Sequence, residues 1–263
     1  MARATRLRVA TFNANSVRAR LPIILEWLAQ HRPDVLCLQE TKVADAEFPQ
    51  EAFNEAGYRV YFRGEKAHAG VAIATREEPD AVEFGFTRGT ERDETRLARL
   101  TLRGVPIVNT YVPQGQSLES PMFAYKLKWF ERLREFFAQH YKPTQPLIWV
   151  GDLNVAPEEI DLARPKDNQN HVCFHISVRQ ALRKVVQWGF VDVFRRHHPE
   201  PGHYTFWDYR FPTALAKNIG WRVDHILATR AATERCVACF IDKEPRLKPK
   251  PSDHTFVVAD FTM

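Results

Sequence analysis

Four polar side chains follow apolar, strand-like segments at the point where each segment ends. They are Asn13 after Val-Ala-Thr-Phe, Glu40 after Leu-Cys-Leu-Gln, Tyr111 after Val-Asn-Thr, and Asp152 after Ile-Trp-Val-Gly. Any one of them alone has an ordinary interpretation, because Asn, Asp and Glu often cap a turn or the next helix. Together they offer oxygen ligands of the kind Mg²⁺ prefers and groups that can move a proton. That combination favours phosphoryl chemistry.

Two further acidic positions stand at the opposite ends of their strands. Asp224 lies near the start of Val-Asp-His-Ile-Leu, and the pair Asp253-His254 comes just before Thr-Phe-Val-Val. If all these side chains meet at one rim, the last two strands must run antiparallel to the others. The sequence therefore predicts mixed sheets and argues against a purely parallel sheet or barrel, whose sites gather at C-terminal strand ends. Adjacent strand residues face opposite sides, so we expect Asp224 to face the site and His225 to be structural.

Short β-branched or aromatic runs alternate with helical patterns along the chain. Apolar residues at helical spacing predict three helices, around Leu21–Leu28, Phe123–Phe130 and Val178–Val186, and the first should end near His31 because Pro33 disfavours helix at the residue before it. The predicted strands are Arg8–Phe12, Val35–Gln39, Gly70–Thr75, Val105–Tyr111, Leu147–Gly151, Arg222–Ala228 and Thr255–Phe261.

Composition narrows the class of protein. The chain has 263 residues, 44% of them hydrophobic, and a formal net charge of +5, which permits a polyanionic partner without requiring one. We expect one domain covering residues 1–263. The residues after the basic start are too polar for a secretory signal, and no apolar run approaches the roughly 18 residues of a membrane span, so we expect a soluble, cytoplasmic monomer. Cys236 and Cys239 have redox or zinc spacing, but without a second metal-ligand pair they are interpreted as small hydrophobic residues.

A set of motifs stands in a fixed order along the chain, within residues 9 to 261. The motifs are Phe12-Asn-Ala-Asn-Ser-Val-Arg, Leu38-Gln-Glu-Thr-Lys, Tyr111-Val-Pro-Gln-Gly, Gly151-Asp-Leu-Asn-Val-Ala-Pro, Tyr204-Thr-Phe-Trp-Asp-Tyr-Arg, Gly220-Trp-Arg-Val-Asp-His-Ile-Leu and Pro251-Ser-Asp-His. In this order they resemble exonuclease III and related AP endonucleases. The resemblance implies a four-layer α/β sandwich of the α+β type, in which two mixed β-sheets pack face to face and helices flank them.

The resemblance also implies a role for each matching residue. Glu40 would be the main ligand of Mg²⁺, for which Mn²⁺ would substitute, and Asn13, Asn15 and Asp253 would lie near the ion directly or through water. Asp152 would transfer a proton to or from the attacking water or the leaving group, with Asn154 holding water or a phosphate oxygen. His254, oriented by Asp224, would be an imidazolium beside the scissile phosphate, to which Tyr111 would donate a hydrogen bond.

A further group of residues is expected to contact DNA. Phe206, Trp221 and Val223 resemble the apolar wall of a pocket for a flipped abasic sugar, although the two aromatics could also be core residues. The polar loop from Leu162 to His175 would set access to that pocket. Candidates to hold phosphates are Arg18, Lys42, Gln114, Lys126 and Arg222.

The resemblance implies a Mg²⁺-dependent DNA-repair phosphodiesterase. It would hydrolyse the backbone of double-stranded DNA 5′ to abasic sites and process blocked 3′ ends as a 3′-phosphodiesterase, 3′-phosphatase and 3′→5′ exonuclease from the same site. Two alternatives stay open. One is a phosphatase or phosphodiesterase of the same fold with a non-DNA substrate, since fold alone does not fix substrate. The other is a catalytically silent DNA-binding protein.

Overall fold

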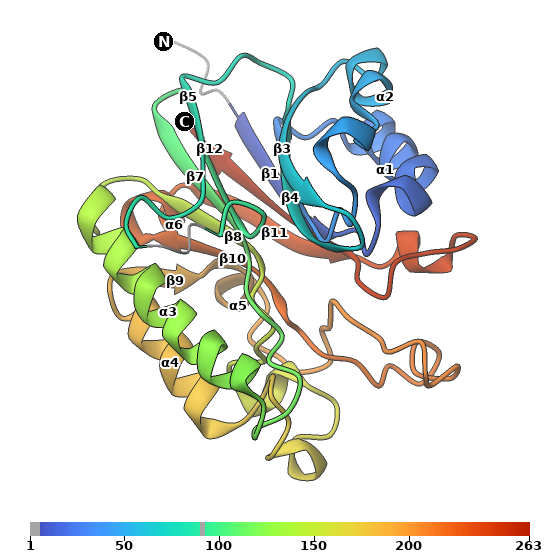
Figure 1. Cartoon of the computed structure of the whole chain (residues 1–263), viewed down its shortest axis with the longest axis vertical. Coiled ribbons are helices and arrows are strands. Elements are labelled where there is room, and N and C mark those ends of the chain that lie inside the picture. Colours follow the sequence, from blue (N-terminus) through green and yellow to red (C-terminus); the bar gives the residue numbers. More distant parts are fainter. Residues whose placement is uncertain (1–5, 90–92) are drawn as a thin grey trace.

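Strands in the described part of the chain form two six-stranded sheets (Figure 1). The computed structural model describes residues 6–89 and 93–263, so residues 1–5 and 90–92 of the expected 1–263 domain lie outside the described residues. The first sheet has the order β11 (Cys236–Asp242), β12 (Phe256–Thr262), β1 (Arg6–Asn13), β2 (Val35–Gln39), β4 (His68–Thr75) and β3 (Arg59–Glu65). The second has the order β5 (Ala81–Phe84), β6 (Leu97–Leu102), β7 (Val105–Tyr111), β8 (Ile148–Asp152), β10 (Asp224–Thr229) and β9 (Phe190–Asp192).

Both sheets are mixed, in the way the strand-end argument requires. β1 runs parallel to β2 and antiparallel to β12, and β7 runs parallel to β8, which is antiparallel to β10. The C-terminal ends of β1, β2, β7 and β8 therefore lie at the same rim as the N-terminal ends of β10 and β12. The prediction of mixed sheets is confirmed.

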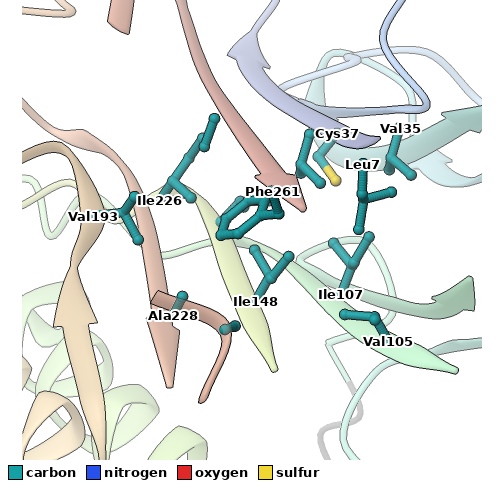
Figure 2. Close-up of a cluster of buried hydrophobic side chains, with 14 of the residues drawn as sticks. Leu7, Val35, Cys37, Val105, Ile107, Ile148, Val193, Ile226, Ala228 and Phe261 are labelled. Atoms are coloured by element: carbon teal, nitrogen blue, oxygen red, sulfur yellow. The ribbon is translucent and has the colours of Figure 1, made fainter. Parts of the chain in front are cut away.

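The inner faces of the two sheets bury one apolar core between them (Figure 2). Leu7, Cys37 and Phe261 of the first sheet lie opposite Ile107, Ile148 and Ile226 of the second. Alternation along each strand sends the remaining side chains to the outer faces.

Helices cover those outer faces (Figure 1). α1 (Val17–His31) and α2 (Gln50–Glu55) pack on the first sheet, and α3 (Pro121–His140) and α4 (Ile176–Val186) pack on the second. The short helices α5 (Val193–His197) and α6 (Arg230–Thr233) flank β9 and β10. The predicted four-layer sandwich is confirmed. As expected, α1 ends just before Pro33, with Arg32 in the left-handed region at φ 44°.

The predicted strands are present, with ends shifted by at most two residues, and the shift at the start of β10 has a physical cause. We predicted a strand over Arg222–Ala228, but β10 begins at Asp224. The backbone N–H of Arg222 donates to the carbonyl of Asp161 at 2.7 Å, so this residue is bonded to a loop and not to the β-ladder.

The two cysteines at redox spacing lie in β11, where they are buried free thiols. Burial raises the pKa of the Cys236 thiol to about 11 and that of Cys239 well above its usual value. Neither thiol is activated as a nucleophile, since the reactive form is the thiolate. In the described residues, no helix combines the length and the apolar character needed to cross a membrane.

Candidate active site

The rim where the strand ends meet brings together polar residues from both sheets. In the second sheet, Tyr111, Asp152 and Asp224 lie side by side, because Asp152 is in register with both of the others. In the first sheet, Asn13 ends β1, Glu40 directly follows β2, and Asp253 and His254 are separated from the start of β12 by Thr255 alone. The site is therefore assembled across the seam between the sheets.

Glycine is required immediately before Asp152. Gly151 has φ 138°, and a Cβ at this position would lie 1.9 Å from the carbonyl oxygen of Thr110 on β7. A side chain there would force β7 and β8 apart at the point where both deliver site residues. The Gly-Asp pair in the sequence thus has a steric reason.

His254 and Asp224 form a buried pair. His254 Nδ1 lies 2.8 Å from Asp224 Oδ2, and both side chains are almost completely inaccessible to solvent. Burial opposes the charged imidazole, but the carboxylates of Asp224, Asp152 and Asp253 outweigh it and raise the pKa of His254 to about 10. His254 is therefore an imidazolium at neutral pH.

Asp152 lies next to that cation. Its Oδ2 is 4.0 Å from His254 Nε2 and accepts a hydrogen bond from Asn13 Nδ2 at 2.8 Å, while Oδ1 accepts from the Asn154 backbone N–H at 2.8 Å. Burial, followed by the charge of Asp224, raises the pKa of Asp152 to about 7. A carboxyl group near its midpoint at neutral pH can both accept and return a proton.

Glu40 is held by Asn13 at the end of β1 and by Lys42 in the loop after β2. Its carboxylate accepts from Asn13 Nδ2 at 2.7 Å and pairs with Lys42 Nζ at 2.7 Å, and Lys42 also donates to Asn15 Oδ1 at 2.6 Å. Burial opposes ionisation of Glu40, but Lys42 and Asn13 outweigh it and lower its pKa. The carboxylate is therefore ionised and available to a cation.

The expected metal-binding residues gather here, and one of them, Asn13, differs from the sequence expectation. Possible ligand atoms of Glu40, Asp152 and His254 lie within 4.8 Å of one another. Asn13 presents its N–H to Glu40 and Asp152 while its own oxygen accepts from the Asn15 backbone N–H at 2.9 Å, so it holds the carboxylates instead of offering a free oxygen. Asp253 accepts from Asn15 Nδ2 at 2.9 Å.

Tyr111 and Asn154 complete the rim. Burial and the nearby carboxylates of Glu40 and Asp152 raise the pKa of Tyr111 well above its usual value, so its phenol keeps its proton and remains a donor. Asn154 donates from Nδ2 to the Val112 carbonyl at 2.9 Å. The Asp224 oxygen Oδ1 is buried without a hydrogen-bond partner among the described residues, which leaves an acceptor at the centre of the site.

A cavity of about 600 Å³ adjoins these groups. Glu40, Asn154, Asp253 and His254 form part of its lining, and the predicted wall residues Phe206, Trp221 and Val223 lie in the same lining together with Gln114. The loop predicted to control access also contributes, through residues that include Arg164, Asn168 and His171. The polar rim and the wall formed by Phe206, Trp221 and Val223 thus border one continuous cavity.

The structure contradicts the phosphate-binding prediction for Lys126. Its side chain is completely buried, and Nζ donates to the carbonyls of Gln114, Asn154 and Val172 at 3.0, 2.7 and 2.9 Å. All three ammonium protons are therefore used to tie α3 to two loops. Lys126 therefore connects α3 to the backbone of the loops that carry Gln114 and Asn154, and its ammonium group cannot reach a phosphate.

The same prediction was wrong for Arg222, for a related reason. The guanidinium is 1% exposed and pairs with Asp161 at 2.8 Å and with Asp192 at 2.7 Å. Its Nη1 also lies 3.0 Å from His225 Nδ1. Arg18 and Lys42 do remain accessible, with side-chain exposures of 58% and 31%.

Several residues of the site were missed from the sequence. His171 lies against Trp221 with ring centroids 4.7 Å apart, and Phe211, 64% exposed, lines the cavity. Thr205 Oγ1 accepts from the backbone N–H groups of Val223 and Asp224 at 3.1 and 3.2 Å and so positions Asp224. Phe211 could have been found as a large apolar residue in a polar segment, and Thr205 from its place inside the motif that begins at Tyr204.

Comparisons with known proteins agree with this geometry. Residues 10–254 match the model of the Endonuclease/Exonuclease/phosphatase family. The chain is 31% identical to exodeoxyribonuclease III of Haemophilus influenzae, over 97% of this chain and 100% of the relative. A solved AP endonuclease from Archaeoglobus fulgidus is similar with a TM-score of 0.95 and 48% identity, covering 98% of this chain and 100% of that one.

A third similarity is to the 3′ phosphatase NExo from Neisseria, bound to a product DNA hairpin, with a TM-score of 0.89 and 33% identity over 98% of this chain and 100% of that one. The chain belongs to the Endonuclease/Exonuclease/phosphatase family. Within that family it is a hydrolase of the exodeoxyribonuclease III type.

Proposed function

We propose that this protein is a Mg²⁺-dependent phosphodiesterase that hydrolyses double-stranded DNA 5′ to abasic sites and also processes blocked 3′ ends. The observation that carries the proposal is that the ionised rim and an aromatic wall share one cavity, since Glu40 and His254 line it together with Phe206 and Trp221. A sugar without its base is compact and costs little to unstack, so such a cavity can accept it. The names of the relatives quoted above point to the same substrates.

The donor set fits a hard cation. Glu40 provides an ionised carboxylate, and Asn15 and Asp253 provide further oxygens close by, which suits Mg²⁺ or Mn²⁺ better than a softer metal. Lys42 bridges Glu40 and Asn15 and supplies positive charge at these oxygens. When bound, the ion would supply charge neutralisation for the phosphate and the leaving 3′ oxygen.

The protein groups would divide the remaining work. In an in-line attack, the water oxygen forms a bond to phosphorus, a water proton passes to Asp152, and the bond from phosphorus to the 3′ oxygen breaks. The freed 3′ oxygen takes up a proton from solvent to become the 3′ hydroxyl, and Asp152 returns its proton to solvent. The His254 imidazolium, held by Asp224, and the Tyr111 phenol would stabilise the negative charge on the phosphate oxygens. Asn154 would orient the water or a phosphate oxygen. The charges are placed before substrate arrives.

The same groups would act on any phosphodiester or phosphomonoester that reaches them. For this reason we propose 3′-phosphodiesterase, 3′-phosphatase and 3′→5′ exonuclease activity from the one site, with Phe206, Trp221 and Val223 selecting among substrates. Arg18, Lys42 and Gln114 would hold phosphates of the duplex. We further propose that the chain is a single domain and acts in the cytoplasm as a monomer. Size-exclusion chromatography with light scattering would test the monomeric state.

The direct test is incision of a labelled duplex that carries one tetrahydrofuran abasic analogue. The analogue cannot undergo β-elimination, so a cut reports hydrolysis. We expect cleavage 5′ to the analogue with Mg²⁺, none with excess chelator, and none in an undamaged duplex. Shortening from the 3′ end alone would favour a 3′-end processor. No cleavage with Mg²⁺ or Mn²⁺ would favour a non-DNA substrate or a silent DNA-binding protein.

A further inference from the structure

We propose that the loop after α5 holds a second metal site, separate from the catalytic rim, for a divalent transition-metal ion such as Zn²⁺. Its ligands are His198, Glu200 and His203, whose nearest ligand atoms all lie within 4.8 Å of one another. Glu200 Oε1 is 2.7 Å from His203 Nε2 and 3.5 Å from His198 Nδ1. Two imidazoles and one carboxylate are a common set of protein ligands for Zn²⁺.

The hydrogen bonding of His198 fixes which ring nitrogen is free. His198 Nε2 lies 2.8 Å from the carbonyl oxygen of Cys239 on β11, and because a carbonyl only accepts, Nε2 must carry the proton. In the neutral ring Nδ1 then carries the lone pair, and Nδ1 is the atom that points at Glu200. Metal-binding histidines are oriented in this way, by donating their other N–H to a backbone carbonyl or carboxylate.

The surrounding rings restrain both histidines. His198 stacks on Phe194 with ring centroids 4.7 Å apart, His203 meets the edge of the same ring at 5.4 Å, and the two imidazoles are 5.2 Å apart. The intervening segment contains Pro199 and Pro201, which limit its backbone freedom. Little reorganisation is needed to bring the three ligand atoms to the roughly 3.3 Å spacing that bonds of about 2.0 Å in a tetrahedral site imply.

The site is open enough to receive an ion. Side-chain exposures are 33% for His198, 54% for Glu200 and 31% for His203, so a water molecule can reach the fourth position. Imidazole ligands favour Zn²⁺ or Ni²⁺ over Mg²⁺, so the two sites should differ in the metal they take. A bound ion would fix the end of α5 (Figure 1), and through the His198–Cys239 hydrogen bond also β11, to the segment that leads from His203 to Thr205. Thr205 in turn positions Asp224.

The test is a calorimetric titration of the metal-stripped full chain with Zn²⁺ in the presence of excess Mg²⁺, which protects the oxygen-rich rim. We expect one Zn²⁺ site in the wild type and a loss of affinity of at least about 10-fold in Glu200→Gln and in His203→Gln, since removing even an outer partner of a ligand costs that much. Two control variants should keep the site. Glu234→Gln removes an exposed carboxylate elsewhere, and Glu40→Gln removes the main carboxylate of the rim.

A second readout does not depend on the variants. In the folded wild type, nitrogen NMR of the histidine rings should show Zn²⁺ shifting His198 Nδ1 and His203 Nε2 ahead of other ring nitrogens. Equal Zn²⁺ affinity in Glu200→Gln and the wild type, or Zn²⁺ binding abolished by Glu40→Gln, would overturn the proposal. So would the absence of any shift at His198 and His203.

Discussion

Asp152 Oδ2 and His254 Nε2 lie 4.0 Å apart, and burial shifts the pKa values of the two side chains in opposite directions. Burial and the neighbouring carboxylate of Asp224 raise the pKa of Asp152 to about 7, and for His254 the same carboxylate overcomes burial and raises the pKa to about 10. At neutral pH the histidine therefore keeps its proton while the aspartate can gain or lose one. This difference is what assigns proton transfer to Asp152 and charge stabilisation to His254 in the proposed mechanism.

Replacing Asp152 with Asn should separate chemistry from binding. The amide cannot take a proton from water, so we expect abasic-site incision to fall by about 10²- to 10⁴-fold. Affinity for the abasic duplex, measured by fluorescence anisotropy in excess chelator, should change little. Asp208→Asn removes another carboxylate that lines the cavity and is the matched control. A mutant that cuts as fast as the wild type would remove Asp152 from the mechanism.

His225 gives a prediction about stability and pH. Its Nε2 lies 2.9 Å from the Val155 carbonyl and must carry the proton, so Nδ1, which faces Arg222, accepts. Burial, together with the Arg222 charge, lowers the pKa of His225 to about 4. The unfolded chain binds this proton near pH 6.5 and the folded chain only near pH 4, so stability is full above that window and falls as pH drops through it.

The loss assigned to His225 is up to about 3 kcal/mol of unfolding free energy. Urea unfolding at several pH values between 7 and 4.5 would measure it. His225→Asn is expected to be less stable at pH 7 but to depend less steeply on pH. Parallel pH profiles for the variant and the wild type would show that other groups cause the decline.

At the scale of elements, Arg222 joins three segments that are distant in sequence. Arg222 lies two residues before β10, and its guanidinium pairs with Asp161 in the 3₁₀ turn Glu159–Asp161 and with Asp192 at the end of β9. The two aspartates lower the cost of burying the cation, and the arginine in turn, with Arg195, lowers the pKa of Asp161 to about 2 against the effect of burial. The network fixes the position of the loop that carries Trp221 relative to the second sheet.

Arg222→Met should therefore destabilise the fold instead of weakening DNA contacts. Removing one partner leaves buried carboxylates without compensation, which typically costs about 3 to 5 kcal/mol. Urea unfolding measures this cost, and Arg230→Ala, which removes an exposed partner of Glu234, should cost less than about 1 kcal/mol. A stable Arg222→Met protein whose DNA binding is weaker would restore the phosphate-contact interpretation.

The sequence was sufficient for the strands that carry the site and insufficient for several others. The predicted strands around the rim are buried on both faces and read as continuous apolar runs, and their polar ends revealed the site. β3, β5 and β11 were missed because they are edge strands with exposed positions, and β9 because it has only three residues. β6 was missed although it lies inside the second sheet, because Arg99 and Thr101 interrupt its apolar run. Lys126 and Arg222 were misassigned because nothing local distinguishes a buried cation from an exposed one when its carbonyl or carboxylate partners lie 12 to 61 residues away.

At the scale of the whole molecule, charge bears on how substrate is held. The net charge is only +5, so binding to DNA should depend on a few local cations and not on a general field. Contacts with phosphates release counterions, and we expect affinity for an abasic duplex to fall at least about 100-fold between roughly 50 and 200 mM salt. Anisotropy titrations in chelator would measure the slope. Lys42→Ala should reduce the slope, and a flat response would point to a small substrate.

The position of β12 links activity to the closing of the first sheet. This strand lies between β11 and β1, and Asp253 and His254 stand just before it, so the first sheet is divided whenever β12 is out of place. With β12 detached, the second sheet would keep Asp224 but would lack the imidazolium that Asp224 is placed to hold. Local opening of this one strand would therefore switch the proposed hydrolysis off, because the strand that closes the sheet also carries the imidazolium.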